Sequence, residues 1–240
     1  MSEKKTAQLF DKYAKTYDQE VHKSLGGLAV ACNEKTFFNK HKVHCIKRMV
    51  PGVECCRRIL DYGCGTGGVM KELVKELPAA HITGFDISTD IMTIAKEQLY
   101  DQKNVEWITE PRPEEPFDLI ILANVLHHVS PLDRISLLVQ VRRCLSVNGI
   151  VVVFEHNPLN LLTLKVVRDC PFDKDAVLLN PSALVKCTNE AGFVEINTKY
   201  ILYLPWIGFL PDMVESLMGD FPLGAQYISV FKQDTKAEIN

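Results

Sequence analysis

The sequence predicts an α/β fold in which helices cover both faces of a mostly parallel sheet. Two observations favour this fold class. Short apolar runs that suit buried strands alternate with stretches of helical spacing between residues 57 and 154. The first of these runs, Ile59-Leu60, leads through a glycine-rich loop into a helical pattern from Val69 to Leu77. A strand, a glycine loop and a helix in this order form the ligand-binding turn of a doubly wound sheet.

The loop after this first strand combines a carboxylate with glycines. Asp61 stands at the C-terminal end of the strand, and glycines follow at positions 63, 65, 67 and 68. Glycine accepts positive φ and has no Cβ, so the backbone can turn tightly and lie against a ligand. Positions 63, 65 and 68 satisfy the G-x-G-x-x-G pattern of dinucleotide-binding loops, but a carboxylate two residues earlier would repel an anionic pyrophosphate. The loop therefore favours a positively charged ligand.

The whole string Asp61-Tyr62-Gly63-Cys64-Gly65-Thr66-Gly67 resembles the first motif of class I S-adenosylmethionine-dependent methyltransferases. The ammonium and sulfonium groups of S-adenosylmethionine suit a carboxylate at this place. The resemblance implies a Rossmann-like, mostly parallel sheet of seven strands with an antiparallel last strand, an N-terminal helical lid, and S-adenosylmethionine as the cofactor. The cofactor-binding residues that it implies in this loop are Asp61, Gly63, Cys64, Gly65, Thr66 and Gly67.

Two further acidic residues are candidates for contacts with the nucleoside part of the cofactor. Asp86 ends the next predicted strand, residues 82–86, nineteen positions after Gly67. This is near the ~20-residue spacing of a carboxylate that binds ribose hydroxyls, and we expect Ile87 beside it to contact the cofactor as well. The alternative is that Asp86 caps the following helix, for which Ser88 is better placed. After a strand at 105–109, the resemblance implies a polar contact with the adenine amino group, and Glu110 is the candidate in a proline-rich connection.

The N-terminal fifty residues contain two predicted helices. In the first, residues 6–20, the segment from Phe10 to Asp18 resembles the F-x-x-Y-A-x-x-Y-D segment of small-molecule methyltransferases, which forms part of a lid over cofactor and substrate. Tyr13 and Tyr17 are the implied contacts, and the alternative is a helix that only packs on the sheet. The second helix, residues 36–49, carries two histidines and a cysteine at positions 41, 44 and 45. No carboxylate or second cysteine completes a set there, so we predict no metal site.

The remaining elements complete the expected sheet. Strands are predicted at 117–124 and 150–154, joined by a helix at 131–145 and a turn at Asn148-Gly149, with right-handed crossovers. A helix from 181 to 191 and strands at 193–202 and 226–232 follow. Between these strands the apolar residues Trp206, Phe209, Met213, Leu217 and Met218 have helical spacing. They predict core packing, with an apolar acceptor pocket or a dimer surface as the alternatives.

Candidate catalytic groups lie after two of the central strands, where ligands of such sheets collect. The string Asn124-Val125-Leu126-His127-His128-Val129 resembles the fourth motif of the family, so Asn124 is a predicted cofactor contact. If the acceptor is an oxygen, it has to lose a proton, and the predicted catalytic residues are His156, His128 and Glu155. The Glu-x-Asn-Pro string at residue 155, with the stretch from Pro171 to Ala176, resembles a subgroup of bacterial methyltransferases that act on small acceptors. We expect residues 157–180 to cover the acceptor pocket.

Length and composition bound the remaining possibilities. The 240 residues predict a single domain, with a helical lid at 1–50, a cofactor-binding core at 57–155, and substrate-side insertions with the last strands at 156–240. A formal net charge of −3 without a long basic block disfavours nucleic acid as a partner. Eight cysteines without paired spacing, and no apolar run of ~20 residues, predict a reduced cytoplasmic protein without a membrane span.

The sequence thus predicts methyl transfer from S-adenosylmethionine to a small-molecule acceptor, at oxygen, by a monomer or homodimer. Three alternatives stay open. A non-enzymatic scaffold could keep the nucleoside-cofactor site, and the acceptor could be a macromolecule. A nicotinamide-dependent oxidoreductase is disfavoured by Asp61 and by the absence of a Y-x-x-x-K pair.

Overall fold

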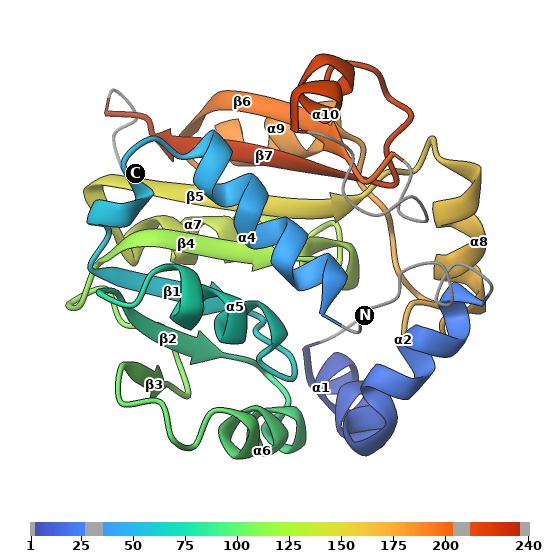
Figure 1. The fold of residues 1–240 in the computed structure, drawn as a ribbon, viewed down its shortest axis with the longest axis horizontal. Helices are drawn as coiled ribbons and strands as arrows, with labels where there is room; N and C mark the ends of the chain where they lie inside the picture. The colour runs from blue at the N-terminus through green and yellow to red at the C-terminus, as the bar shows by residue number, and fades with distance from the viewer. Residues whose placement is uncertain (1–2, 27–35, 204–211, 236–240) are drawn as a thin grey trace.

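The computed structural model describes residues 3–26, 36–203 and 212–235. Seven strands form one sheet in the order β3-β2-β1-β4-β5-β7-β6 (Figure 1). Neighbouring strands from β3 to β5 are parallel, whereas β7 is antiparallel to both β5 and β6. The predicted fold class, with its antiparallel last strand, is confirmed. The strands are β1 (Arg58–Tyr62), β2 (His81–Phe85), β3 (Val105–Trp107), β4 (Phe117–Ala123), β5 (Leu145–His156), β6 (Phe193–Ile201) and β7 (Gln226–Gln233).

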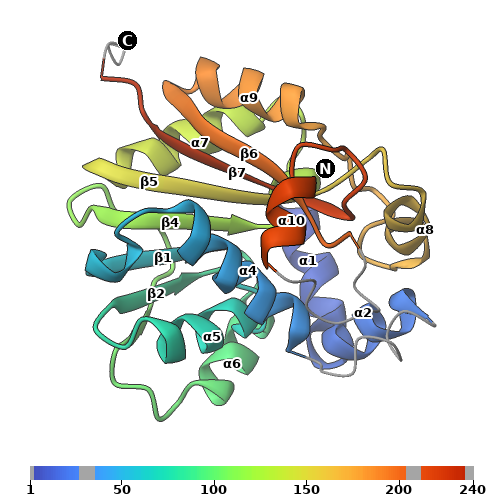
Figure 2. The ribbon, with the colours of Figure 1, turned by 45° about the horizontal axis from the view of Figure 1, so that its top comes forward.

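Alternate side chains of the central strands pack into two separate hydrophobic cores, one on each face of the sheet. On one face, Ile59 and Ile121 pack with the helices α4 (Phe37–Met49) and α5 (Gly68–Glu76). On the other face, Leu60 and Leu122 pack with α7 (Arg134–Arg143) and α9 (Pro181–Glu190). This alternation follows from the two-residue period of a strand, and both faces are apolar because helices cover both. Figures 1 and 2 show these helix layers on either side of the sheet.

The order in which the chain adds strands to the sheet reverses between β1 and β4, and this reversal determines where the site lies. The chain runs outward from β1 through β2 to β3 and then returns to β4 on the other side of β1. At the carboxyl ends of these two strands, Asp61 pairs with Ile121 and Tyr62 with Leu122. The glycine loop that follows β1 therefore lies beside the loop that follows β4. In open α/β sheets, such a switch point is where ligands bind.

The N-terminal region differs from the single helix expected at 6–20. It consists of α1 (Glu3–Tyr13), a 3₁₀ turn η1 (Ala14–Thr16) and α2 (Tyr17–Leu25). Contacts join α1 to α6 (Thr89–Gln98), and α2 to α8 (Leu161–Asp169). The turn at 14–16 redirects the chain, so α1 and α2 reach separate parts of the molecule (Figure 2).

Two other local expectations need correction or fall outside the described residues. Asn148 and Gly149 were expected to form a turn, but they lie within β5, which starts at Leu145, where its pairing with β4 is irregular. The expected apolar segment between the last strands includes α10 (Asp212–Met218), but Trp206 and Phe209 lie outside the described residues. Short 3₁₀ helices occur at η2 (Val53–Cys55) and η3 (Leu126–His128).

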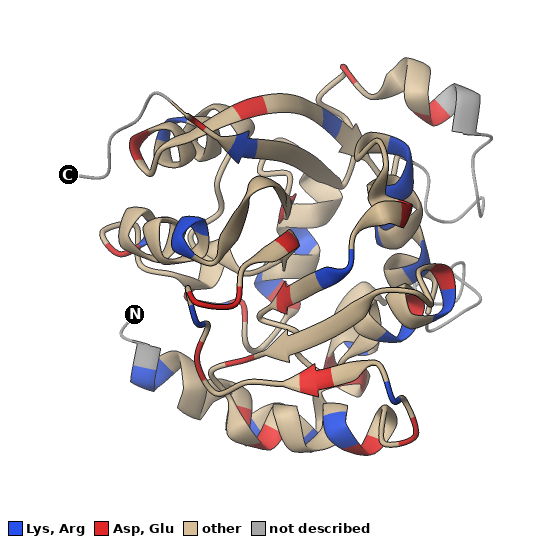
Figure 3. Ribbon diagram, turned by 90° about the vertical axis from the view of Figure 1, so that its left-hand side faces the viewer, with Lys and Arg blue, Asp and Glu red and all other residues tan. Residues whose placement is uncertain are grey.

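Lys and Arg are interspersed with Asp and Glu along the chain in the view of Figure 3, as the formal net charge of −3 suggests. Within the described ranges, no helix is both long enough and apolar enough to cross a membrane.

Candidate active site

The loop between β1 and α5 depends on its glycines. Gly63, Gly65 and Gly67 all have positive φ, at 78°, 53° and 80°. A Cβ on Gly63 would lie 2.6 Å from Cγ2 of Val125, so this part of the loop touches the chain that follows β4. A Cβ on Gly65 would meet nothing within 4 Å. The first glycine thus allows two loops to approach each other, and Gly65 leaves open space in front of the backbone.

Asp61 is buried in an unusual way. Its side chain is 1% exposed, and neither carboxylate oxygen has a hydrogen-bond partner among the described residues. Burial, and then the nearby charge of Asp86, raise the pKa of Asp61 to about 7, while Lys42 acts to lower it. Lys42 on α4 is also buried, and burial lowers its pKa to about 8. Buried polar groups normally have partners, so the orphaned carboxylate points to a hydrogen-bond donor that the described residues do not supply.

Asp86 connects the glycine loop to the start of α6. Its Oδ2 accepts a hydrogen bond from the backbone N–H of Gly65 at 3.0 Å, and its Oδ1 accepts one from Ser88 at 2.9 Å. The N-cap of α6 is Ser88, whose Oγ accepts from the N–H of Ile91 at 3.2 Å. Burial raises the pKa of Asp86, and the backbone hydrogen bonds oppose this shift. The carboxylate therefore holds the loop in shape at the edge of a cavity.

That cavity encloses ≈ 860 Å³, its open mouth included, within the size range of small-ligand pockets. It runs from the glycine loop, past Asp86, to the residues that follow β4. Apolar side chains such as Phe85, Ile91 and Leu137 form much of its wall. Seven of the residues predicted from sequence line it, namely Gly63, Gly65, Asp86, Ile87, Asn124, Tyr17 and His128.

The other predicted cofactor residues, Asp61 among them, are not among the residues that line this cavity. Thr66 donates to Oδ1 of Asp18 at 3.4 Å. A Cβ on Gly67 would lie within 3.3 Å of both Ala95 and Leu99, so this glycine allows α6 to pack closely. Cys64 is buried, and the ring of Tyr13 lies 6.1 Å from that of Phe172. Glu110 is exposed in the connection after β3 and is not among the residues that line the cavity.

Aromatic rings join the N-terminal helices to the far end of the cavity. Tyr17 stacks on Phe172 with ring centroids 4.8 Å apart and planes 16° apart. Phe10 meets the ring of His128 edge to face at 5.0 Å. Because Tyr17, Phe10 and His128 all line the cavity, the N-terminal helices contribute to its wall rather than packing only on the sheet.

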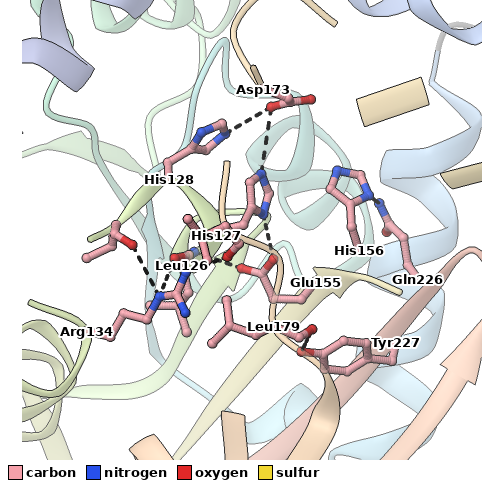
Figure 4. A network of polar contacts seen from close by, with 12 residues as sticks. Leu126, His127, His128, Arg134, Glu155, His156, Asp173, Leu179, Gln226 and Tyr227 are labelled. Atoms are coloured by element: carbon pink, nitrogen blue, oxygen red, sulfur yellow. Dashed lines mark hydrogen bonds and ion pairs between the residues drawn. The ribbon is translucent and has the colours of Figure 1, made fainter. Parts of the chain in front are cut away.

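A buried polar network lies behind His128 (Figure 4). Glu155, at the end of β5, is fully buried, and its Oε1 accepts from the backbone N–H of Leu126 at 2.8 Å. Its Oε2 lies 2.6 Å from Nδ1 of His127. The Nε2 atoms of His128 and His127 lie 3.3 Å and 3.8 Å from the same oxygen, Oδ1 of Asp173. Two loops and a strand end thus converge on one cluster.

The histidines of this network are neutral near pH 7. Burial, and then the charge of Arg134, lower the pKa of His127 to about 3. Burial, and then His127, lower the pKa of His156 to about 3 and that of His128 well below its usual value. A neutral imidazole keeps one nitrogen lone pair, which can accept a proton or bind a cation.

The three predicted catalytic residues therefore occupy different places. His128 lines the cavity, whereas Glu155 holds His127 and the Leu126 backbone from behind. The ring of His156 lies 5.0 Å from that of His127 and faces a second cavity of ≈ 560 Å³. That second cavity has mostly apolar walls, which include Leu162, Val166 and Leu202.

Sequence reasoning missed two residues that the fold brings to the site. Asp173 lies in the stretch from Pro171 to Ala176, which resembles a subgroup of methyltransferases, so the sequence did mark this stretch. The spacing of its apolar residues, however, did not show that the chain returns to His128 there. Lys42 lies on a predicted helix, and its proximity to Asp61 depends on how α4 crosses the sheet. Both depend on long-range packing rather than on local pattern.

Comparisons with known proteins agree with this geometry. Residues 60–151 match a family model described as a methyltransferase domain. The chain is 31% identical over 124 residues to malonyl-[acyl-carrier protein] O-methyltransferase 1 of Ilyobacter polytropus, covering 50% of this chain and 41% of that protein. It is 29% identical over 161 residues to demethylmenaquinone methyltransferase of Thermotoga maritima, covering 66% of this chain and 65% of that protein. The chain thus spans less than two thirds of the length of either relative.

Solved structures support the same fold. A SAM-dependent methyltransferase from Archaeoglobus fulgidus superposes with a TM-score of 0.60 and 18% identity, covering 81% of this chain and 94% of that one. At this identity the likeness concerns the fold. With the matching domain, the glycine loop and the acidic residues after β1 and β2, it leads to one assignment. Residues 60–151 thus match a methyltransferase domain, and the chain is similar to class I S-adenosylmethionine-dependent methyltransferases in its fold.

Proposed function

We propose that this chain transfers a methyl group from S-adenosylmethionine to an oxygen atom of a small-molecule acceptor. The observation that carries the proposal is one cavity lined by the glycine loop, Asp86 and His128. Such a cavity holds a cofactor and an acceptor next to each other, and proximity is the main contribution that a protein makes to this reaction. The name of the Ilyobacter relative supports oxygen as the acceptor atom.

The residues at the cofactor end fit S-adenosylmethionine. The orphaned carboxylate of Asp61 is suited to the ammonium group, because a buried carboxylate without a partner gains most from a charged donor. Asp86 has lone pairs left for ribose hydroxyls after binding Gly65 and Ser88. Ile87, 38% exposed, offers an apolar surface to the adenine ring. When bound, S-adenosylmethionine supplies a methyl carbon that its sulfonium already activates.

The residues at the acceptor end handle the hydroxyl proton. His128 is the predicted catalytic residue that lines the cavity, and Asp173 lies directly behind it. An acceptor hydroxyl placed against this wall needs a group that takes its proton or stabilises its oxygen as it becomes negative. His128, with Asp173 and His127 behind it, offers such groups beside the cavity. Glu155 acts through His127 as a positioning residue.

A binding and labelling experiment tests the proposal. Isothermal titration calorimetry should show binding of S-adenosylhomocysteine and no binding of NADH, and binding of NADH alone would overturn the assignment. Labelled S-adenosylmethionine should then transfer its methyl group to hydroxyl-bearing molecules in a small-metabolite fraction. A parallel reaction should contain protein, RNA and acyl-carrier-protein thioesters, because the Ilyobacter relative is named for a carrier-protein acceptor.

The outcomes separate the alternatives. Label that enters only protein or RNA would refute a small-molecule acceptor. Cofactor binding without transfer to any fraction would favour a non-enzymatic scaffold. His128→Asn should lose methyl transfer, while its S-adenosylhomocysteine binding should change by less than about threefold. The control is His81→Asn, which should change neither property, because the ring of His81 lies at the exposed start of β2 beside Glu106.

A further inference from the structure

We propose that His127, His128 and Asp173 form a binding site for one divalent transition-metal ion of the zinc class. The ligand atoms are Nε2 of each imidazole and Oδ1 of the carboxylate, and all three lie within 4.8 Å of one another. Figure 4 shows both rings directed at the same oxygen of Asp173. Two imidazoles and one carboxylate, with further positions open, are a donor set that zinc and iron(II) sites use.

The separations are compatible with coordination. With bonds of about 2.0–2.1 Å around a tetrahedral ion, neighbouring ligand atoms lie about 3.3 Å apart. Nε2 of His128 lies 3.3 Å from Oδ1 of Asp173, and Nε2 of His127 lies 3.8 Å from it. The second distance is too long for a hydrogen bond, but a small inward movement of one ring brings it to a ligand separation.

The tautomer of His127 supplies an independent argument. Its Nδ1 lies 2.6 Å from Oε2 of Glu155, whose other oxygen already accepts from the Leu126 N–H. A carboxylate in this position accepts both bonds, which places the ring proton on Nδ1. Nε2 then carries a bare lone pair. It is buried, has no hydrogen-bond partner and points at the Asp173 carboxylate. A lone pair that faces a carboxylate is unfavourable unless a proton or a metal cation lies between them, and an ion at this place would satisfy both groups.

Glu155 also has the role that metal sites give to a second carboxylate. Histidine ligands usually donate their other ring N–H to a carboxylate, a carbonyl or a water, and this fixes the tautomer that binds the metal. Glu155 is fully buried, and its described bonds go to His127 and to the loop backbone.

The charges nearby permit a cation. Both imidazole side chains are largely buried. The positive group near them, Arg134, directs its guanidinium at the backbone carbonyls of Leu126, Val129 and Val177 instead of Asp173. A divalent ion among the ligands would therefore be balanced by the carboxylates of Asp173 and Glu155.

A second cluster in the described part of the chain has a simpler explanation. His41, Cys45 and Glu215 also lie close together and are buried. Here Nε2 of His41 lies 3.1 Å from Oε1 of Glu215, and the Arg48 guanidinium lies 3.7 Å from Oε2. Glu215 also accepts from the N–H of Leu202. An ion-pair network accounts for these contacts, and a metal would compete with Arg48. This cluster therefore serves as the comparison in the test.

The consequence for catalysis rests on the proposed function. Because His128 is also part of the cavity wall, an ion held at this cluster would lower the pKa of an acceptor hydroxyl placed against it. Metal binding itself does not depend on methyl transfer, so the two proposals can be tested separately.

The experiment measures metal binding directly. The purified chain is stripped with a chelator and titrated with Zn²⁺ in competition with a chromophoric chelator, and with Co²⁺ followed by visible absorption. One ion should bind per chain, without the intense near-ultraviolet band that a thiolate ligand gives. Mg²⁺ should not compete, because it prefers oxygen ligands. Asp173→Asn and His128→Asn should each weaken Zn²⁺ binding by at least about 100-fold, and Glu155→Gln by about 10–100-fold.

The controls make every outcome decisive. Asp175→Asn, an exposed carboxylate two residues from Asp173, should leave the Zn²⁺ affinity within twofold, and so should Cys45→Ser. Loss of binding in Cys45→Ser with no change in Asp173→Asn would assign the metal to the other cluster and overturn the proposal. Circular dichroism and S-adenosylhomocysteine binding verify that each variant folds. If a ligand variant does not fold, His128→Gln is measured in its place. Methyl transfer by a stripped chain that takes up no Zn²⁺ would refute the metal site and keep the proposed function. Zn²⁺ binding without methyl transfer would support the metal site and refute the proposed function.

Discussion

The buried carboxyl group of Asp61 makes cofactor affinity depend on pH. In the free protein its pKa is raised to about 7, chiefly by burial. A ligand ammonium binds the carboxylate form, so the proton has to leave before binding below pH 7. Affinity should therefore fall about tenfold for each pH unit below 7, and by roughly 50- to 100-fold between pH 7.5 and pH 5.

The assay is calorimetric titration of S-adenosylhomocysteine from pH 5 to 7.5, where the ligand ammonium stays protonated. Asp61→Asn is the matched variant, because the amide keeps the shape and cannot ionise. At pH 7.5 it should bind more weakly than the parent chain by about 1.5–3 kcal/mol, since a charged partner is lost. Its affinity should be almost flat across the range.

The refuting result is a slope that persists in Asp61→Asn. Such a slope would have to come from another group, and Asp173, whose pKa burial raises to about 6, would be the first to examine. A parent chain with no pH dependence would also contradict the argument, because it would mean that the Asp61 carboxyl either does not face the ligand or is already ionised at pH 5.

The same group predicts a change in stability of the free protein. Its folded pKa of about 7 exceeds its ordinary value of 3.8, so the folded state binds the extra proton between these values. Stability therefore decreases as pH rises from about 4 to 7, and the full cost remains above pH 7. Relative to the parent chain, Asp61→Asn should gain about 2–4 kcal/mol between pH 4 and 8. Urea unfolding without cofactor measures this, and parallel curves for the two proteins would contradict it.

Three further predictions concern residues that the sequence predicts to bind the cofactor. Gly63→Ala should lower the free energy of unfolding in urea by about 2–4 kcal/mol, because the φ of Gly63 is 78° and the added Cβ would meet Val125. Gly65→Ala should lower it by only about 1–2 kcal/mol but weaken S-adenosylhomocysteine binding at least tenfold. Equal losses of stability in the two variants would contradict the difference between the surroundings of the two glycines. Tyr17→Ala should lose about 0.5–1.5 kcal/mol with its ring stack and raise the dissociation constant several-fold, and an unchanged constant would remove this residue from the site. Glu110→Ala should change the same constant by less than about twofold because the side chain is exposed away from the cavity, and a tenfold loss would show that its connection closes onto the ligand.

Much of the fold was predictable because its signals are local. The apolar runs, the glycines and the carboxylate at the end of β1 each report on a few neighbouring residues, and the parallel order of the central strands follows from crossover rules. The N-terminal region was predicted less well. Its apolar stripe continues through Ala14 and Tyr17, so periodicity could not show the 3₁₀ turn that separates α1 from α2.

The site was predictable in part, for the same reason. Residues that follow a strand end directly, such as Asp86 and Asn124, reach the cavity because the sheet edge places them there. The meeting of Asp173 with His128 depends instead on how a segment 45 positions later in the chain folds back. Burial of Lys42 beside Asp61 depends on the packing angle of α4. No short-range pattern contains this information.

One arginine ties the reactive loop to the segment that carries Asp173. The Arg134 guanidinium donates to carbonyls on both sides, at Leu126 and at Val177, and the N–H of Val177 donates back to His127. These bonds mean that the two parts cannot be exchanged independently between relatives. A chimaera that imports residues 170–179 without a compatible arginine would lose the hydrogen bonds that Arg134 donates to the carbonyls of Leu126, Val129 and Val177. Attempts to redirect acceptor choice should therefore transplant α7 together with that segment.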